Sequence, residues 1–263
     1  FDADGTEVDM TVPDDFPLGT YTVEGQIKDE AGNPTTVTLI LVVTPTLEID
    51  IDHEEGALTP DWEGDNGGGY VGVSVDAALA STGYGLWADS SEGTSQYAYL
   101  HFPQVNTDTM RLRFYIDVQN LTNATSGADY LHIIGIKSYN EDDHICYIRL
   151  RHNSLGYYIQ VDAKENGDVD YPLTSMGGSI SATAENYVEV MIVRADSGQS
   201  NGEAYLWVNG SLEASATDVG NDEQFTNLGF IEAGIFHKNG EWAGNVYLDE
   251  IIINNTGDEI GPL

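Results

Sequence analysis

The feature that most constrains the fold is an apolar segment close to the C-terminus, residues 245–253, which reads NVYLDEIII. Its pattern suits a strand buried on at least one face, because side chains alternate between the two faces of a strand. The turn-forming sequence NNTG follows from Asn254. A buried strand so late in the chain needs a sheet that the preceding residues have already built. We therefore expect a large β-sandwich whose last strand joins its two ends.

The rest of the chain also favours strands. Glycine (29) and tyrosine (15) are plentiful among the 263 residues, and no long stretch has the 3.6-residue periodicity of a helix. Asn209-Gly210 is a typical type I′ hairpin turn. The expected strands include residues 110–118, 130–139, 144–151, 157–163, 187–194, 203–209 and 230–236. About ten strands punctuated by turns predict an all-β, two-sheet sandwich.

The charge is strongly one-sided, with 44 acidic residues, 9 basic ones and a formal net charge of −35. Phosphate binding requires a basic surface, so nucleic acid is excluded as a partner, and insertion into an anionic membrane is not expected either. The acidic excess fits calcium coordination, a saline extracellular environment or a merely solvated surface. Cys146, the single cysteine, lies in an apolar run, and we expect a buried structural thiol.

The first 45 residues differ from the remainder of the chain. Residues 20–28 and 35–43 read as two strands joined by the turn sequence DEAGNP. This order resembles the closing strands of bacterial and archaeal immunoglobulin-like or cadherin-like surface domains. The resemblance implies a partial domain, residues 1–45, completed by upstream residues or by a neighbouring chain through strand addition. The second domain is expected at residues 46–263.

The second domain has its own resemblance. The sequences EGALTPDW from Glu55, VSVDAALASTGY from Val73 and YLWVNG from Tyr205 are similar to segments of concanavalin-like jelly rolls of the laminin-G or carbohydrate-binding type. The resemblance covers about residues 50–256 and implies a concanavalin-like sandwich. It specifies the fold much more closely than any activity.

Calcium is the leading chemical prediction, because this hard cation takes six to eight oxygen ligands. In the carbohydrate-binding jelly rolls that the chain resembles, a structural calcium joins the first strand to the last. The implied ligands here are Asp52, Glu54, Glu55 and Asp249. The alternatives are that backbone amides or a nearby side chain hold Asp249, and that Asp50, Asp52 and Glu54 form an interdomain calcium site.

The sequence EIDID from Glu48 resembles the Glu-x-Asp-x-Glu signature of family 16 glycoside hydrolases, in which two carboxylates on one face of a strand perform catalysis. Here the last carboxylate is Asp52, which is one methylene shorter. The motif also opens its domain, whereas those enzymes carry it on a central strand. An acidic edge strand or calcium ligation is therefore the preferred interpretation.

Candidate glycan-binding residues are aromatic and cationic side chains expected at the surface, namely Tyr205, Trp207, Trp242, Arg149 and Arg151. Flat aromatic faces can cover the apolar faces of sugars, and guanidinium groups bind carboxylates bidentately. The alternative for the aromatics is packing. The alternative for the arginine pairs, Arg111/Arg113 and Arg149/Arg151, is cross-strand pairing with carboxylates such as Asp117 or Glu189.

Four N-x-S/T triplets, at Asn120, Asn123, Asn209 and Asn254, are potential glycosylation sites. The histidines show no zinc-type spacing, and no nucleophile elbow, P-loop or dinucleotide fingerprint is present.

The sequence favours a non-catalytic extracellular surface protein, a calcium-stabilised adhesion or carbohydrate-binding module whose partner is a glycan. The alternative is a structural subunit of a surface layer or filament, completed by a neighbouring surface-protein chain or assembled as a homo-oligomer. A third hypothesis is a family-16-like glycosidase or a polysaccharide lyase. It requires a carboxylate pair or a base in a cleft, and no convincing set stands out along the sequence.

Overall fold

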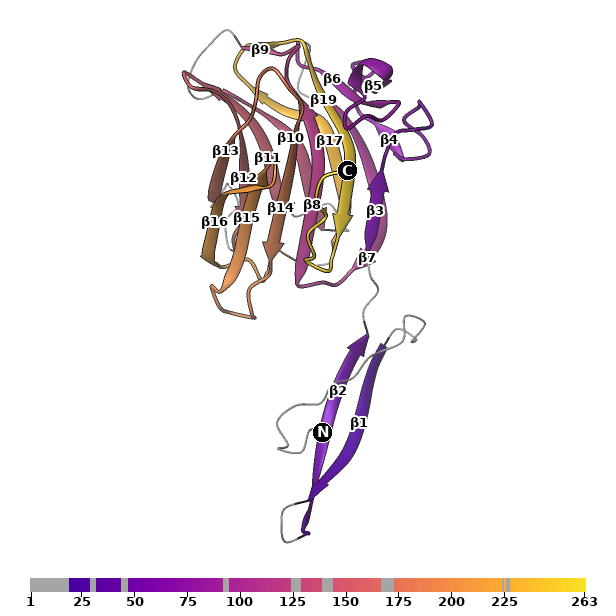
Figure 1. Cartoon of the computed structure of the whole chain (residues 1–263), viewed down its shortest axis with the longest axis vertical. Coiled ribbons are helices and arrows are strands. Elements are labelled where there is room, and N and C mark those ends of the chain that lie inside the picture. The colour runs from indigo at the N-terminus through magenta and orange to yellow at the C-terminus, as the bar shows by residue number, and fades with distance from the viewer. Residues whose placement is uncertain are drawn as a thin grey trace. The chain divides into compact units, whose positions relative to one another are not determined.

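The computed structural model of the chain is shown in Figure 1. The structure describes residues 19–28, 32–43, 47–91, 95–123, 129–138, 144–166, 173–223, 225 and 228–263. The predicted all-β fold is confirmed, since two large antiparallel sheets account for most of the described chain. The chain divides into two compact units, Phe1–Pro45 and Thr46–Leu263. In the described residues, no helix has the length and apolar character needed to cross a membrane.

In the first unit, β1 (Gly19–Lys28) and β2 (Pro34–Val43) form an antiparallel hairpin. The strands pair along their whole length, from Gly19 opposite Val43 to Lys28 opposite Pro34. They match the two strands that the sequence predicts here. A single hairpin does not define an immunoglobulin-like domain, so that part of the prediction is untested.

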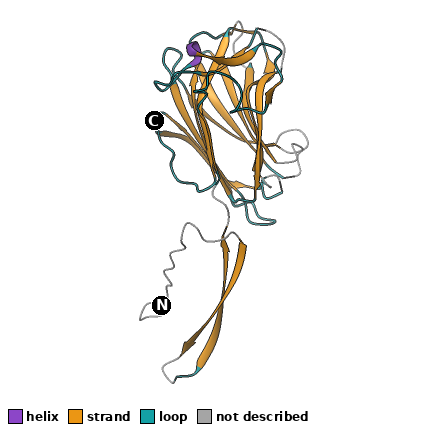
Figure 2. Cartoon of the chain, turned by 90° about the vertical axis from the view of Figure 1, so that its right-hand side faces the viewer, coloured by secondary structure: helices purple, strands orange, loops and turns teal. Residues whose placement is uncertain are grey.

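The second unit is a sandwich of two antiparallel sheets, seen in a second view in Figure 2. The seven-stranded sheet has the order β13-β12-β11-β10-β17-β7-β4. Its strands are β4 (Gly64–Asp65), β7 (Gln96–Val105), β10 (Tyr130–Ser138), β11 (His144–Asn153), β12 (Gly156–Lys164), β13 (Leu173–Ser179) and β17 (Leu228–Asn239).

The eight-stranded sheet has the order β16-β15-β14-β8-β19-β6-β5, with β3 also paired to β19. Its strands are β3 (Glu48–Ile51), β5 (Val71–Ser74), β6 (Gly85–Asp89), β8 (Thr109–Asp117), β14 (Asn186–Val193), β15 (Gly202–Val208), β16 (Ser211–Val219) and β19 (Asn245–Asn254). A small pair, β9 (Thr122–Asn123) with β18 (Trp242–Ala243), and a short 3₁₀ turn, η1 (Val75–Ala77), complete the elements of the described chain.

The core lies between the two sheets and is built by period-2 alternation. On β8 the predicted apolar face is buried: Leu112, Phe114 and Ile116 have 0% exposure. The facing strands contribute Ile, Val and Leu side chains in the same alternating way. Because one face of each strand fills this core, the residues between the core positions line the outer faces of the sandwich.

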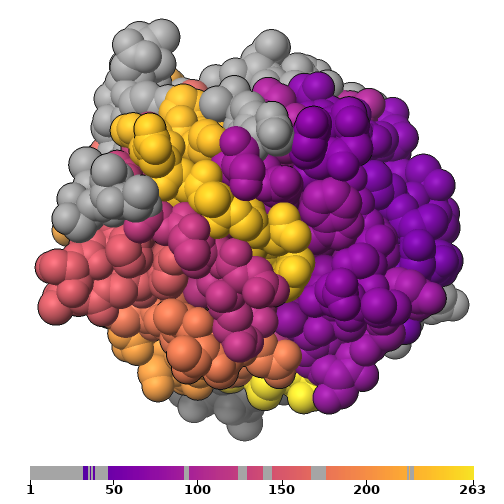
Figure 3. All heavy atoms as spheres, turned by 90° about the horizontal axis from the view of Figure 1, so that it is seen from above, coloured from indigo at the N-terminus to yellow at the C-terminus, as the bar shows by residue number. Residues whose placement is uncertain are grey.

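The apolar C-terminal strand, β19, occupies the centre of the eight-stranded sheet. It pairs with β8 on one side; on the other, its first half pairs with β6 and its second half with β3. A register shift separates Asp249 from Ile252, and Glu250 has a positive φ of 50°. The strand thus joins early and late segments of the unit, as predicted. Figure 3 shows late residues, in yellow, between early segments in purple and middle segments in magenta and orange.

The two outer faces differ in what covers them. The C-terminal residues lie along the eight-stranded sheet, where Arg111 Nη1 donates to Gly257 O at 2.9 Å and Arg113 Nη1 donates to Gly261 O at 3.2 Å. Ile260 N also donates to Glu189 Oε1 at 2.8 Å. Three hollows lie along the outer face of the seven-stranded sheet. That face is the place to look for a site.

Candidate functional site

The outer face of the seven-stranded sheet carries a continuous set of polar and aromatic side chains. On β11, Tyr147, Arg149 and Arg151 alternate with the buried Ile148 and Leu150. The neighbouring strands repeat this alternation, so the set extends across the sheet. Its members are Tyr97, Tyr99 and His101 on β7; Phe230, Glu232, Phe236 and His237 on β17; Tyr130, His132 and Lys137 on β10; His144 on β11; and Tyr158, Gln160 and Asp162 on β12.

His132 lies at the centre of this face. Across the sheet it stands opposite His237 on β17 and Arg149 on β11. Both pairings shift register just after His132, and such bulges re-aim side chains at functional sites. Its ring lies 4.9 Å from that of Tyr147 and 5.3 Å from that of Phe236, between centroids. Rings from the two neighbouring strands, β11 and β17, therefore flank the imidazole.

His132 is held neutral by its surroundings. It is only 3% exposed, and its Nε2 has no hydrogen-bond partner among the described residues. Burial, and then the charges of Arg149 and His237, lower the pKa of His132 to about 3. A neutral imidazole with an uncommitted nitrogen is free to accept a proton. This Nε2 is also a buried polar atom, and such atoms in proteins normally have a hydrogen-bond partner.

Ion pairs fix two cations around His132. Lys137 Nζ lies 3.0 Å from Glu232 Oε2, and His144 Nε2 contacts Glu232 Oε1 at 3.3 Å. Burial lowers the pKa of His144, against the opposing effect of its hydrogen bond to Glu232. Arg149 pairs with Asp162 at 2.7 Å. These contacts hold both cations in place on the sheet while partly neutralising them.

Arg151 differs from the other two cations. Its Nη1 donates to the neutral Gln160 Oε1 at 2.6 Å, and its guanidinium lies near the rings of Tyr130 and Tyr158. In the described part of the chain it has no carboxylate partner within ion-pair distance. An arginine with an uncharged partner keeps its charge available to an incoming anion. It is the best-placed anion-binding group of the face.

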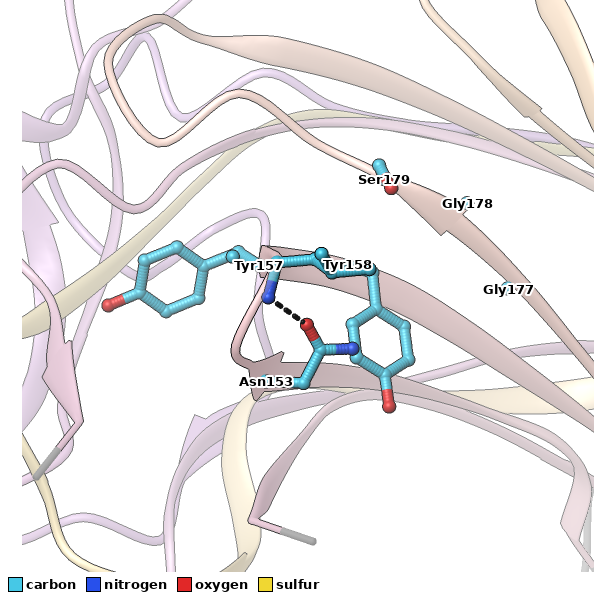
Figure 4. A pocket seen from close by; sticks show the side chains of 8 residues that line it. Asn153, Tyr157, Tyr158, Gly177, Gly178 and Ser179 are labelled. Carbon is cyan, nitrogen blue, oxygen red and sulfur yellow. Dashed lines mark hydrogen bonds between the residues drawn. The ribbon is translucent and has the colours of Figure 1, made fainter. Parts of the chain in front are cut away.

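Hollows of the size of sugar units lie along this face. One of about 270 Å³ surrounds His132, Tyr147 and Phe236. A second, of about 460 Å³, shares Tyr97, Lys137 and Glu232 with the first. A third, of about 240 Å³, lies at the β11–β12 hairpin and is drawn in Figure 4, where the rings of Tyr157 and Tyr158 point in opposite directions. The first two, which share lining residues, form a groove across the strands, and the third lies beyond it on the β11–β12 side of the sheet.

The structure separates the predicted glycan-binding residues. Arg149 and Arg151 lie on the same outer face as the groove, on β11. Tyr205 and Trp207 stack at 5.6 Å on β15, in the other sheet, with the Arg111 guanidinium 4.5 Å from the Trp207 ring. Trp242 is 4% exposed and its Nε1 donates to Asn239 O, so it does not occupy the exposed position that a sugar platform requires.

The two arginine pairs, alike in sequence, have different environments. Arg111 and Arg113 are on β8 of the eight-stranded sheet, where they pair with Glu189 and Glu250. This is the cross-strand pairing with Glu189 that the sequence left open as an alternative. Only the Arg149/Arg151 pair lies on the groove face.

Most of the groove residues were not predicted from the sequence, among them His132, Tyr147, Lys137 and Glu232. The histidines lack zinc-type spacing and so gave no signal of their own. The available signal was the polar face that recurs in YLH, YIRLR, YIQVD and FIE across four predicted strands. Reading those faces together requires the order of strands in the sheet, which the sequence does not show.

The predicted metal ligands are partly brought together. Asp52 and Glu55 join Asp61, which was not predicted, with carboxylate oxygens within 4.8 Å of one another. Burial, followed by the charge of Glu55, raises the pKa of Asp61. Glu54 turns away, and its Oε1 accepts from Gly83 N at 2.7 Å. The calcium site is an untested prediction.

Asp249 is separate from this acidic group. Its Oδ2 accepts from Leu79 N at 2.9 Å and from Thr82 Oγ1 at 2.5 Å, and its Oδ1 contacts His53 Nδ1 at 3.1 Å. Trp62 Nε1, which can only donate, lies 3.0 Å from His53 Nε2. His53 therefore accepts through Nε2 and donates from Nδ1 to Asp249. Protein groups satisfy this buried carboxylate, as the alternative interpretation supposed.

The segment that resembles the family 16 signature lies outside the groove. Glu48 and Asp50 are exposed on β3, which pairs only with β19 among the described strands. Burial and the charge of Asp52 raise the pKa of Asp50. These carboxylates face no hollow on the seven-stranded sheet, so the edge-strand interpretation fits their position.

The potential glycosylation sites are in turns and at strand ends. Asn120 and Asn209 are exposed, and Asn123 and Asn254 are half-buried. Asn209 takes a positive φ of 50° in the hairpin turn, and its Oδ1 accepts from Tyr187 N. Glycosylation itself is untested.

Comparison with solved structures finds similar folds. An endo-β-1,4-glucuronan lyase from the fungus Trichoderma reesei is 13% identical, covers 82% of this chain and 98% of its own, and has a TM-score of 0.57. A mutant of the alginate lyase Aly36B in complex with alginate tetrasaccharide is 12% identical, with coverages of 81% and 98% and a TM-score of 0.53. A botulinum neurotoxin type C structure, from work on its interaction with two ganglioside molecules, is 11% identical, with coverages of 90% and 48% and a TM-score of 0.50. No protein-family model and no curated protein matches the sequence.

These matches show a jelly-roll-like β-sandwich, in agreement with the predicted fold class. They contradict the prediction of a non-catalytic adhesion or carbohydrate-binding module, and with it the prediction that the chain is not an enzyme. The glucuronan and alginate lyases carry catalysis on a sandwich of this kind. The error has a physical origin: we sought a base or a carboxylate pair within single segments, whereas the groove assembles its groups from several strands.

Proposed function

We propose that the protein is a polysaccharide lyase that cleaves uronate-containing polysaccharides by β-elimination. The observation that carries this proposal is His132, a buried neutral imidazole with an unpartnered Nε2, placed in a groove beside Tyr147 and opposite Arg149, on a face that also carries Arg151. The likeness in fold to glucuronan and alginate lyases supports it.

The charge distribution supports an anionic substrate. The chain has only 9 lysines and arginines and 6 histidines against 44 acidic residues. Three of those 9 cations (Lys137, Arg149, Arg151) and four of the 6 histidines (His101, His132, His144, His237) lie on the groove face. The guanidinium and ammonium groups among them give a polyanion cationic partners on this face.

β-Elimination makes three demands on the site. The C5 proton, which lies α to the uronate carboxyl group, must pass to a base; the carboxylate charge must be compensated; and the leaving O4 must gain a proton. The C5–H and C4–O4 bonds break, a C4=C5 double bond forms, and no water is consumed. The products are an unsaturated uronate and a new chain end that carries a hydroxyl group.

The groove offers one group for each demand. Arg151 binds the carboxylate, because its guanidinium has no anionic partner among the described residues. His132 Nε2 accepts the C5 proton, and the pKa of about 3 keeps it unprotonated before substrate arrives. Tyr147, whose ring is 4.9 Å from that of His132 between centroids, donates its hydroxyl proton to O4. The substrate carboxylate, once bound, favours the protonated imidazole that forms.

Two of the untested predictions become part of this proposal. A polysaccharide substrate is too large to cross a membrane, so a lyase of this kind acts outside the cell, in keeping with the predicted extracellular location. The predicted glycan partner becomes the substrate, bound by Arg149 and Arg151 in the groove.

The test is an elimination assay on uronate polysaccharides, with the ultraviolet absorbance of the unsaturated product as the readout. His132→Gln removes the base and should lower kcat by about 10²–10⁴-fold. Arg151→Gln should raise KM. Tyr205→Phe, in the other sheet, is the control and should leave both unchanged. A wild-type protein that releases no unsaturated product from any uronate polysaccharide would refute the proposal, and so would a folded His132→Gln variant with unchanged kcat.

A further inference from the structure

The two ends of the groove carry opposite charge. At the β11–β12 end, which carries Arg149 and Arg151, Asp162 is the carboxylate among the described residues that contacts these arginines, and it pairs with Arg149. The remaining polar groups of that end are neutral: Gln160, and, around the hollow of about 240 Å³ in Figure 4, Asn153, Tyr158 and Ser179. This end has an excess of positive charge and suits an anionic sugar.

The β4–β7 end is acidic. Its hollow of about 460 Å³ is lined by the three carboxylates Glu63, Asp65 and Glu232. Lys137 and His144 engage Glu232, but Asp65 is exposed and its Oδ1 accepts only a backbone bond, from Gly67 N at 3.2 Å, among the hydrogen bonds of the described residues. Glu63 bonds His101 at 2.6 Å, and this hydrogen bond lowers the pKa of Glu63 and keeps it ionised. An anionic sugar would meet like charge here.

The same hollow has the groups that bind a neutral sugar. Tyr99 and Phe230 lie nearly parallel, at 6.2 Å and 20°, and Tyr97 completes an aromatic wall. Asn66 Nδ2 donates to the Tyr97 hydroxyl at 3.1 Å, beside the exposed carboxylate of Asp65. Aromatic faces cover the apolar C–H faces of a sugar, and amide and carboxylate oxygens bind its hydroxyl groups. The chemistry of this end is complementary to an uncharged ring.

We propose that the substrate is a mixed polysaccharide, in which the uronate that reacts beside His132 and Arg151 is followed, in the hollow formed by Glu63, Asp65 and Tyr99, by a neutral sugar. This inference rests on the proposed lyase function. The groove selects against a homopolymer of uronates because every such chain places a carboxylate next to Glu63 and Asp65. Selection by repulsion of the wrong unit is a general device of specific binding sites.

The test compares two polymers of similar length, a homopolymer of uronate and a polymer that alternates uronate with a neutral sugar. Both are assayed with a chelator present, because a divalent cation can bridge two carboxylates. We expect kcat/KM for the alternating polymer to exceed that for the homopolymer by at least about tenfold, since one like-charge contact opposes binding to that extent or more. Equal values, or a preference for the homopolymer, would overturn the inference.

A double variant isolates the cause. Glu63→Gln with Asp65→Asn removes two charges and keeps an acceptor oxygen for His101 and for Gly67 N. It should raise kcat/KM for the homopolymer more than for the alternating polymer. The ratio of the alternating-polymer value to the homopolymer value should therefore fall at least about threefold. Glu203→Gln, in the other sheet, is the matched control and should leave the ratio unchanged. A ratio unchanged in the double variant would refute the role of these carboxylates.

Failure of the proposed lyase function can be distinguished from failure of the proposed substrate preference. If neither polymer is cleaved, the proposed lyase function is wrong. Affinity electrophoresis on the two polymers then tests the proposed preference for the alternating polymer separately. Tighter binding of the alternating polymer, reduced by the double variant, supports the specificity as a property of a binding groove. Equal retardation by both polymers refutes it.

Discussion

Replacing Asp249 by alanine should strongly destabilise the sandwich, by an amount that does not depend on calcium. The side chain is 0% exposed and holds the region where β19 meets η1 and the loop after it. It accepts from Leu79 N, Thr82 Oγ1 and Glu250 N and contacts His53 Nδ1. Truncation leaves Leu79 N, Glu250 N and His53 Nδ1 without this acceptor, whereas the Thr82 hydroxyl can donate instead to Leu79 O at 2.6 Å.

The magnitude follows from the three donors that lose their acceptor. A buried donor left unsatisfied costs about 1–3 kcal/mol, and relaxation of the site recovers part of the sum, so we expect a loss of about 4 kcal/mol. For a domain of this size, 1 kcal/mol corresponds to about 2–4 °C, which gives a fall in Tm of about 8–16 °C. Asp249→Asn keeps one acceptor oxygen and should lose roughly half as much.

The assay is urea and thermal unfolding of the whole chain, in excess calcium and in chelator at one ionic strength. Asp117→Ala is the matched control, because that carboxylate serves Gln119 at the end of β8, and it should cost less than about 1 kcal/mol. A loss below about 1 kcal/mol for Asp249→Ala would refute the hydrogen-bonding argument. A loss seen in calcium and not in chelator would instead make Asp249 a calcium ligand.

Three further predictions concern titration, reactivity and metal binding. Burial raises the pKa of Glu250 to about 7, so its contribution to stability is fully present below its ordinary value of 4.5 and is lost as the pH rises through about 7. Glu250→Gln should therefore gain stability relative to the wild type between about pH 5 and pH 8 in thermal unfolding, and parallel curves would contradict this. Burial also raises the pKa of the Cys146 thiol to about 12, so a thiol reagent at mildly alkaline pH should label it only after unfolding; rapid labelling of the native protein would be the contrary result. Calcium at a hundred times its Kd should stabilise the fold by about 2.7 kcal/mol through Asp52, Glu55 and Asp61, and Asp61→Asn should abolish the shift; a wild-type Tm that calcium does not change would end the calcium prediction.

The sequence was most informative where the signal is local. Period-2 alternation identified β8, β10, β11, β12, β14, β15 and β17 to within a few residues, because each strand buries one face in the core. It was weaker for β7, for the edge strand β13 and for the two-residue strands, none of which was expected as a strand in its own right, and it indicated β16 only through the Asn209-Gly210 hairpin turn. Edge strands bury less and so need less apolar patterning.

The sequence by itself therefore determined the fold class, the apolar faces and the central place of the last strand. What each outward-facing residue does was decided only by the tertiary structure. Arg111/Arg113 and Arg149/Arg151 have the same spacing on similar strands, but β8 lies under the C-terminal residues and β11 lies in the groove. His132 and His237 are far apart in the chain and opposite each other in the sheet. Alternation is a property of one strand, whereas the neighbours of a strand are set by long-range pairing, and a site built across strands exists only once that pairing is made.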